Sequence, residues 1–371
     1  MKTRRAFLAT VLFAAGISAG PALPASLRAG RAPLPSQLSD LEFWRIIDTF
    51  SEPGGTFHSD NFVSNEGRFQ AVFPDLIRRT TPGKLYIGVG PEQNFSYMAA
   101  VRPQMAFIID IRRGNLHEHL LYKALMEMSD TRADFLGRLF SRPRPAGLTT
   151  SSTPEALFAA FDAVPASDDL FRRNLAAVIA WLTKTHRLPL SAEDVAGIGY
   201  VYRTAFFADG PALGYQLTGQ GRVSQHPTYA YLMSMKNRDG EQYSYLATEE
   251  RFLFLKALQS RNLVVPIVGD FGGRKALPAI AQYARDNGTL VSAFYLSNVE
   301  QYLNQDGKWA TFCATVGTMP LDSTSTFIRS RVNGRGLTRP REMEGTGMFW
   351  SDLGSMQTET KTCAAGSIGF R

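Results

Sequence analysis

Glycines and an acid follow two apolar runs in the first third of the chain, and together they suit a nucleoside ligand. Residues 85–95, LYIGVGPEQNF, are apolar until Gly88 and Gly90 interrupt them. Residues 105–111, MAFIIDI, form a second apolar run with Asp110 near its end. In an open parallel sheet, ligands bind at the carboxyl ends of strands, where the strand order reverses. Glycines let the backbone approach a ligand there, and an acid can accept both hydroxyls of a ribose.

The loop after the first run is a poor phosphate site. A dinucleotide site needs a third glycine where the helix begins, so that pyrophosphate sits on free N–H groups. Pro91 and Glu92 stand there instead, and proline has no N–H while glutamate repels phosphate. S-adenosylmethionine, which carries an amino acid and a sulfonium but no phosphate, fits better. The alternative is that the glycines form a plain strand-to-helix turn and Asp110 is a surface acid.

Polar residues also follow the apolar runs of the second half. Methyl transfer is an in-line displacement, which needs positioning and, for a poor nucleophile, a base. Asn298 could orient a methyl acceptor and Glu300 could serve as the base, while Asp270 ends the preceding run. The alternatives are helix caps: Asp270 for a helix starting near Arg274, and Ser297 with Asn298 for the helix that holds Glu300.

Two more segments could complete such a site. Tyr295 or Tyr302 could face the sulfonium by cation–π attraction. Residues 60–66, DNFVSNE, are too polar for a core segment, so they form either a lid over the cofactor or a plain capped loop. His117 and His119 lie two apart on an expected helix and point to different faces, so we expect both at the surface.

Alternation of strand and helix between residues 85 and 128 predicts parallel strands with right-handed crossovers. The pattern resumes at 263–271 and continues to 298, and residues 309–316 and 325–332 suggest two further strands, the last at an edge. Helices are expected between these halves at 154–163, 168–184 and 191–207, followed by a hairpin or loop.

The chain is therefore expected to be α/β, with a doubly wound, mostly parallel Rossmann-like sheet and a helical insertion. Residues 38–129 and 246–335 would form the two halves of the core. Residues 130–245 would form a mainly helical insertion or cap, and residues 336–371 a C-terminal tail. The 371 residues, 44% of them hydrophobic, also suit two domains.

Residues 1–29 have the pattern of an export signal. TRRAFLA carries paired arginines as in twin-arginine signals, and the apolar run after it is shorter than the roughly 20 residues of a membrane span. A general secretory signal is the alternative. We expect export, to the periplasm, and no stable membrane span in the mature form; an uncleaved signal would tether the chain to the membrane.

The net charge and the cysteine content limit which classes of ligand and metal site are expected. The formal net charge is +7, and Lys2, Arg4 and Arg5 contribute three of these charges. No basic run is interleaved with aromatic residues, so we expect a small-molecule ligand and no nucleic acid. Cys313 and Cys363 could pair in an oxidising compartment or remain separate thiols. With five scattered histidines they make no recognisable zinc site, and we expect no metal.

Four blocks of the sequence resemble an uncharacterised bacterial protein family. They are LYIGVGPEQNFSYMAAVRPQMAFIIDIRRGNLHEHLLYKAL, NLVVPIVGDFGGRKALPAIAQYARDNGTLVSAFYLSNVEQYL, SDNFVSNE and STFIRS, which span most of residues 40–335. That family is regarded as having a class I S-adenosylmethionine-dependent methyltransferase-like core. The GVGPEQNF block departs from the glycine-richer loop of methyltransferases, which leaves the cofactor open.

The resemblance implies a methyltransferase-type sheet and a set of cofactor-binding residues. Asp110 would hold the ribose, Asp270 would lie near the adenine or the substrate, and the methionine moiety would be lined by Gly88, Gly90, Glu92 and Asn94.

Export and this cofactor fit together poorly, because S-adenosylmethionine is made in the cytoplasm. We expect a methyltransferase-like protein that binds a nucleoside-type ligand at the strand ends, and leave open whether it is an enzyme. The alternative is an exported, non-catalytic binding protein that uses the same cleft. A third interpretation is a hydrolase or transferase that uses Asp270 and Glu300 as a carboxylate pair.

Overall fold

A six-stranded sheet forms the centre of the protein. The computed structural model describes residues 33–217, 221–222, 226–332 and 349–364. The strands lie in the order β5-β2-β1-β6-β7-β8, and β8 is antiparallel to β7 while the other neighbours are parallel. The strands are β1 Leu85–Val89, β2 Met105–Asp110, β5 Val264–Val268, β6 Val291–Ser297, β7 Thr326–Val332 and β8 Phe349–Ser355. The expected mostly parallel α/β sheet is confirmed and is compatible with a Rossmann-like fold.

Strand order reverses beside β1. From β1 the chain moves outward to β2 and β5, and it then returns to the other side of β1 as β6. Leu85 pairs with Met105 of β2 on one side and with Val291 of β6 on the other. The carboxyl ends of five parallel strands therefore lie at one edge of the sheet, on both sides of the reversal.

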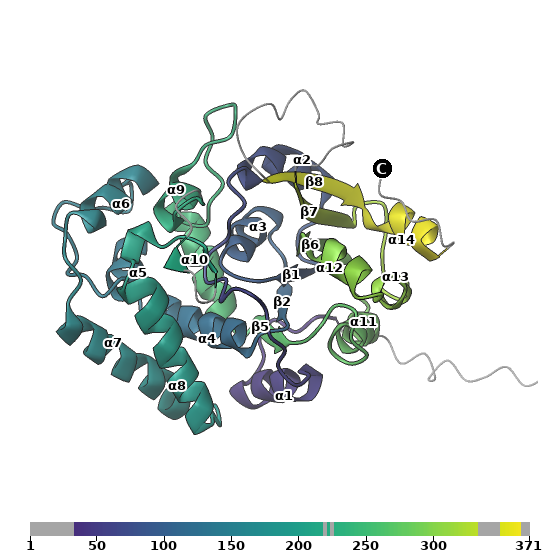
Figure 1. Cartoon of the computed structure of the whole chain (residues 1–371), viewed down its shortest axis with the longest axis horizontal. Helices are drawn as coiled ribbons and strands as arrows, with labels where there is room; N and C mark the ends of the chain where they lie inside the picture. Colours follow the sequence, from purple (N-terminus) through teal and green to yellow (C-terminus); the bar gives the residue numbers. More distant parts are fainter. Residues whose placement is uncertain (1–32, 218–220, 223–225, 333–348, 365–371) are drawn as a thin grey trace, which may run out of the picture.

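Helices cover both faces of this sheet, as its buried, apolar strands require. In Figure 1, α3, α4 and α10 lie to the left of the sheet, α11, α12 and α13 lie to its right, and α1 lies below β5. The helices are α1 Asp40–Phe50, α2 Phe73–Arg79, α3 Gln93–Val101, α4 Arg113–Glu127, α10 Glu249–Ser260, α11 Ala276–Asp286, α12 Val299–Gln305, α13 Trp309–Val316 and α14 Met356–Ala364, with a 3-10 turn at Phe69–Val72.

The segment between α4 and α10 is mostly helical and packs outside α4 (Figure 1). It contains α5 Arg132–Leu139, α6 Pro154–Asp162, α7 Asp168–Ala180, α8 Ala192–Val201, α9 Tyr229–Ser234 and a short hairpin of β3 Gln216–Leu217 and β4 Gly221–Arg222. Turns of π-helix at Trp181–Thr185 and Tyr202–Phe207 extend α7 and α8. Among the described residues, no helix is both long enough and apolar enough to cross a membrane.

Local signals set several helix ends. The side chain of Ser39 caps α1 in a capping box with Glu42, and Thr153 caps α6 ahead of Pro154. Asn287 ends α11, and Gly288 follows it with φ +56°. At each of these three helix ends the sequence has a residue type that is typical of that position.

Two expectations about the strands are wrong. Residues 309–316 form α13, because their apolar side chains recur at helical spacing: Phe312, Cys313 and Val316 are all buried. The strand expected at the sheet edge, β7, lies between β6 and β8, because residues 349–355 add one more strand beyond it.

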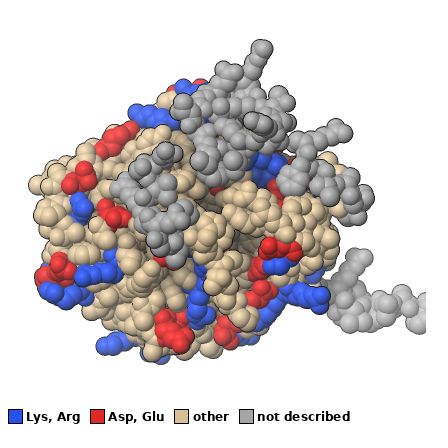
Figure 2. Space-filling model, viewed as in Figure 1, with Lys and Arg blue, Asp and Glu red and all other residues tan. Residues whose placement is uncertain are grey.

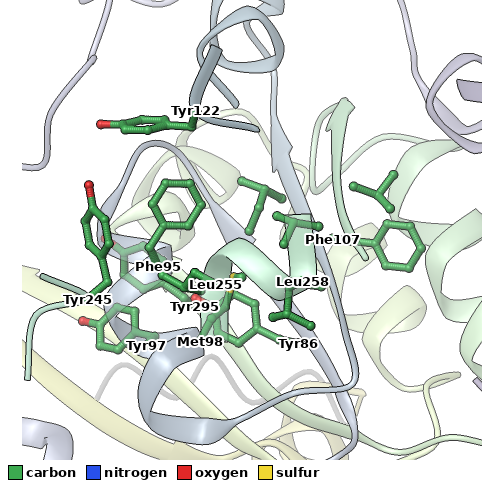
Figure 3. Close-up of a cluster of buried hydrophobic side chains, with 14 of the residues drawn as sticks. Tyr86, Phe95, Tyr97, Met98, Phe107, Tyr122, Tyr245, Leu255, Leu258 and Tyr295 are labelled. Carbon is green, nitrogen blue, oxygen red and sulfur yellow. The ribbon is translucent and has the colours of Figure 1, made fainter. Parts of the chain in front are cut away.

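Aromatic side chains fill the core between the sheet and α3. Figure 3 shows Phe95 between Tyr122 and Tyr245, and its ring meets theirs edge-on at centroid distances of 5.0 and 5.4 Å. Tyr97 and Tyr295 lie against each other at 4.9 Å. This packing fixes α3 directly behind the strand ends.

Surface charges are mixed on the face seen in Figure 2. Basic and acidic side chains are interspersed there among a larger area of other residues. The formal net charge of +7 is therefore not gathered into one basic region on that face.

The two cysteines form a disulfide. Cys313 of α13 is bonded to Cys363 of α14, with 5.8 Å between their Cα atoms. The bond closes a chain segment with a sequence separation of 50 residues and holds the last helix against the body of the protein. Of the two alternatives left open by the sequence, the paired one is correct.

Reduction of this disulfide is expected to lower the melting temperature by several degrees. A closed loop of this length contributes about 4 kcal/mol through the lost entropy of the unfolded chain. The test is thermal unfolding with and without reductant, in the wild type and in the double variant Cys313→Ala, Cys363→Ala. The double variant should melt low and ignore reductant, and equal melting of both proteins under oxidising conditions would contradict the prediction.

Candidate functional site

A pocket opens at the carboxyl edge of the parallel strands. Its cavity volume is about 590 Å³. The ends of β1, β2, β5 and β6 form its base, residues 56–66 form one wall, and α12 and Tyr215 form the rest. Of the eight residues expected to act in catalysis or cofactor binding, four line this pocket, namely Gly90, Asp110, Asp270 and Asn298, while Gly88, Glu92, Asn94 and Glu300 do not.

Gly90 and Asp110 lie side by side in this base. Gly90 has φ +74°, a conformation that favours glycine, and so the chain turns sharply after β1. A Cβ atom placed on Gly90 would lie 4.0 Å from Oδ2 of Asp110 and 3.6 Å from the side-chain nitrogen of Asn61. Backbone and carboxylate therefore face the same space.

Arg112 holds the Asp110 carboxylate. Its Nε and Nη2 donate to Oδ1 and Oδ2 at 3.0 and 2.6 Å, and its backbone N–H donates to Oδ1 at 2.9 Å. A carboxylate offers about four acceptor positions, so one direction stays open for a ligand hydroxyl. Both side chains are nearly buried, which fixes the carboxylate in place.

Gly88 and Asn94 shape the loop from behind the pocket. The Asn94 side-chain amide donates to the carbonyls of Val89, Gly90 and Pro91 at 2.8 to 3.2 Å, and its oxygen accepts from the Tyr86 hydroxyl. A Cβ atom on Gly88 would lie 1.8 Å from that oxygen, so only glycine leaves room for Asn94. Both residues therefore support the turn.

Glu92 is enclosed behind the same turn. It is fully buried, Oε1 accepts from the Ser64 N–H at 3.4 Å, and Oε2 has no hydrogen-bond partner among the described residues. Burial raises the pKa of Glu92 to about 8. It therefore keeps its proton at neutral pH.

Two residues of α4, Glu118 and His119, are further buried polar side chains in this region. Burial, with Glu92 nearby, raises the pKa of Glu118 well above its usual value, and neither of its oxygens finds a partner in the described chain. Burial lowers the pKa of His119 to about 4, so its neutral ring donates from Nε2 to the Gly90 carbonyl at 2.9 Å.

The expected surface position of His117 and His119 is wrong, since both are buried. Their helix, α4, is enclosed between β5 on one side and α8 and α10 on others, so opposite faces of it are covered. His117 is bonded to Asp194 of α8 at 2.8 Å.

Asp270 does not cap the helix after it. Its Oδ1 accepts from the Gly272 N–H, and its Oδ2 pairs with Lys308 at 2.7 Å. The N–H groups of Lys275, directly before α11, and of Ala276, its first residue, instead donate to Glu52, which lies just after α1. Asp270 thus lies at the rim of the pocket in an ion pair, and the capping alternative is wrong.

Glu66, the last residue of the segment 60–66, is a pocket residue to which the sequence assigned no role of its own. Its Oε1 accepts from the Ser297 hydroxyl at 2.6 Å and from the Tyr295 hydroxyl at 2.8 Å, and its Oε2 accepts from the Gln93 amide at 2.7 Å. Burial raises its pKa, opposed by these hydrogen bonds. Segment 60–66 is therefore tied to β6 and α3 and forms a wall of the pocket.

Glu300 is turned away from this wall. It is nearly buried and pairs with Arg329 of β7 at 2.9 Å. Asn298 lines the pocket but makes no side-chain cap to α12. The capping alternative for this strand end is therefore wrong, and Glu66 is the carboxylate that reaches Ser297.

Aromatic rings crowd the side of the pocket nearest α12. Phe57 lies 4.0 Å from His58 and 5.4 Å from Tyr302, between ring centroids. All three residues line the pocket. Tyr295 donates its hydroxyl to Glu66, which leaves Tyr302 as the better placed of the two tyrosines proposed to face a cation.

No metal centre is evident in the ranges that the structure describes, because no three histidine, cysteine, aspartate or glutamate side chains are arranged to hold an ion. What the residues can do is accept hydrogen bonds from a polar ligand, contact a cation through aromatic faces, and take up a proton at Glu66.

The protein is α/β, with a pocket at the strand-order reversal of a mostly parallel sheet. The chain belongs to DUF7790, a family described as a domain of unknown function, which matches residues 61–150 and 152–353. No curated protein matches the chain. The matched residues include all six strands of the sheet apart from the last two residues of β8.

Glu92→Gln is expected to stabilise the protein at pH 8 and to have little effect at pH 4. The folded chain keeps this proton up to about pH 8, while the unfolded chain loses it near 4.5, so the free energy of unfolding falls between these values. The loss approaches about 1.4 kcal/mol for each pH unit in this window. Urea unfolding across the pH range measures it.

Glu193→Gln, at an exposed carboxylate of α8, is the matched control and should leave the pH dependence unchanged. If Glu92→Gln and the wild type lose stability in parallel from pH 4.5 to 8, Glu92 does not hold its proton in the folded state.

Proposed function

We propose that the pocket binds a nucleoside-type small molecule, with S-adenosylmethionine as the candidate cofactor, and that the protein is methyltransferase-like. The observation that carries this proposal is that the left-handed turn at Gly90 and the Asp110 carboxylate lie next to each other in the lining of one cavity. A ligand that lies over Gly90 meets a fixed acceptor at the end of the next strand. This is an arrangement that suits a ribose, one hydroxyl of which the free acceptor position of Asp110 would hold.

The charges of the pocket support a ligand without phosphate. Among the described lining residues there is no lysine, and the one guanidinium, that of Arg112, is committed to Asp110. Four carboxylates, those of Glu66, Asp110, Asp270 and Asp306, line the cavity. A zwitterionic sulfonium compound fits these surroundings better than a dinucleotide does.

Roles for individual residues follow from their positions. Asp110 would accept a ribose hydroxyl at the acceptor position that Arg112 leaves open, and Tyr302 with Phe57 would contact the positively charged sulfonium. Bound S-adenosylmethionine supplies a methyl group to a nucleophile held in line with it. Asn298 would orient that acceptor.

The alternative is an exported binding protein that uses the same cleft without catalysis. The disulfide between Cys313 and Cys363 supports export, because structural disulfides form in oxidising compartments such as the periplasm. The expected signal, residues 1–29, lies outside the described residues. Under this proposal the mature protein has no ready supply of S-adenosylmethionine, and another nucleoside-like ligand occupies the pocket.

Ligand binding is expected to raise the melting temperature. S-adenosylmethionine or S-adenosylhomocysteine at a hundred times its dissociation constant adds about 2.7 kcal/mol to the free energy of unfolding. Asp110→Asn should weaken the affinity at least about tenfold, which is about 1.4 kcal/mol, because the ribose loses a charged acceptor. Thermal shift and titration calorimetry measure both effects.

Asp286→Asn, at an exposed carboxylate on α11, is the control and should bind like the wild type. The absence of any shift with either compound would end the S-adenosylmethionine proposal. Binding without methyl transfer to any acceptor would favour the binding-protein alternative.

Export is expected to depend on the paired arginines. Replacing Arg4 and Arg5 by lysine should retain the protein in the cytoplasm if it uses the twin-arginine route, because that machinery reads both side chains. Cell fractionation followed by immunoblotting measures the distribution. Unchanged export of this variant would point to the general secretory route, and cytoplasmic wild-type protein would contradict export altogether.

A further inference from the structure

The backbone at the end of β6 is strained at a single serine. Ser297 has φ +50°, and α12 begins two residues later at Val299. A left-handed conformation costs a residue other than glycine about 1–2 kcal/mol, and such strain gathers at functional sites. A sharp strand-to-helix turn of this kind presents a serine hydroxyl above the sheet edge. Ser297 lines the pocket.

A carboxylate is already bonded to this hydroxyl. The Ser297 Oγ donates to Oε1 of Glu66 at 2.6 Å. Tyr295 and Gln93 donate to the same carboxylate and fix its position. Because burial raises the pKa of Glu66, its carboxylate is a stronger base than an exposed one.

Ser64 offers an internal comparison. It is the other serine among the described residues that line the pocket, and its hydroxyl donates to the side-chain amide oxygen of Gln93. An amide cannot take a proton from a hydroxyl at neutral pH. The pairing of a serine with a carboxylate therefore distinguishes Ser297.

We propose that Ser297 is a nucleophile towards carboxylic esters bound in this pocket, with Glu66 as its general base. An adjacent base that is itself held in place by further hydrogen bonds is the arrangement that activates a serine. This activity goes beyond the ligand binding proposed above and uses no cofactor. It also differs from a carboxylate pair of Asp270 and Glu300, since those side chains are engaged with Lys308 and Arg329.

The reaction divides into two balanced steps. The Ser297 Oγ attacks the ester carbonyl carbon while its proton passes to Glu66; the bond to the leaving alcohol then breaks, and that alcohol takes the proton. Water next attacks the acyl carbon and gives its proton to Glu66. The Oγ–carbon bond breaks, Oγ regains a proton, and a carboxylic acid leaves. The Asn298 amide, beside Ser297 in the lining, would donate to the developing oxyanion.

A fluorophosphonate probe tests this inference directly, because it forms a covalent bond to an activated serine with loss of fluoride. The full chain is incubated with the probe without S-adenosylmethionine, and mass spectrometry of the digest locates the label. We expect labelling of Ser297 in the wild type, none in Ser297→Ala, and labelling at least tenfold slower in Glu66→Gln. The labelling rate should fall as the pH is lowered and Glu66 becomes protonated.

Ser292→Ala is the matched control. Ser292 lies on β6 too, but it is buried and its hydroxyl donates to the Leu85 carbonyl, so this variant should label like the wild type. Circular dichroism checks the fold of each variant, and if Glu66→Gln does not fold, the two serine variants decide. An unlabelled wild type, or equal labelling of Ser297→Ala and wild type, would overturn the proposal. Neither result bears on S-adenosylmethionine binding, which the thermal shift measures separately.

Discussion

The reversal of strand order beside β1 is the constraint on which the rest of the site depends. Because β2 and β6 lie on opposite sides of β1 and run parallel to it, the crossover helices leave the sheet in opposite directions. The crossover helices therefore diverge at the carboxyl edge between β1 and β6, and a cleft remains there. The turn at Gly90, the Asp110 carboxylate and the Ser297 hydroxyl meet in this cleft because each residue ends or directly follows one of these strands.

Three buried carboxyl groups lie in and behind the lining of the cleft. Glu66, Glu92 and Glu118 are almost completely removed from water, and burial raises the pKa of each. Placing three carboxyl groups in a core costs stability, since apolar side chains of similar size would pack there at lower cost. Three hydrogen bonds to Glu66, from Tyr295 and Ser297 of β6 and from Gln93 of α3, offset part of this cost and fix segment 60–66 in place. Such conflicts between local stability and the fold are typical of functional sites.

The sheet and half of the candidate site could be predicted from the sequence because both follow from local patterns. Apolar runs that stop at glycine or an acid mark strand ends, and so Gly90, Asp110 and Asp270 fell at the cleft. The same pattern does not predict where the side chains after each strand point. The Asn94 amide donates to carbonyls of its own loop, and Glu300 forms an ion pair with Arg329.

Contacts between residues far apart in the chain could not be predicted from local patterns either. Glu66 meets Ser297 across 231 residues of chain, and no periodicity connects the two positions. Residues 309–316 were assigned to the wrong element because a short apolar run fits a strand and a buried helix equally well.

Export and the proposed cofactor are easier to reconcile if the two sides of the cleft have different roles. The side near Gly90 and Asp110 is the one proposed to hold a ribose, whereas the side near Ser297 and Glu66 is the one proposed to act on an ester. Acyl transfer to water needs no compound made in the cytoplasm, so the proposed activity would also be possible in an oxidising compartment, where disulfides such as Cys313–Cys363 form. A nucleoside-like ligand that carries an ester would engage both sides at once. In that case the methyltransferase-like features, the turn at Gly90 and the Asp110 carboxylate, would bind the ligand, and the reaction would take place at the end of β6.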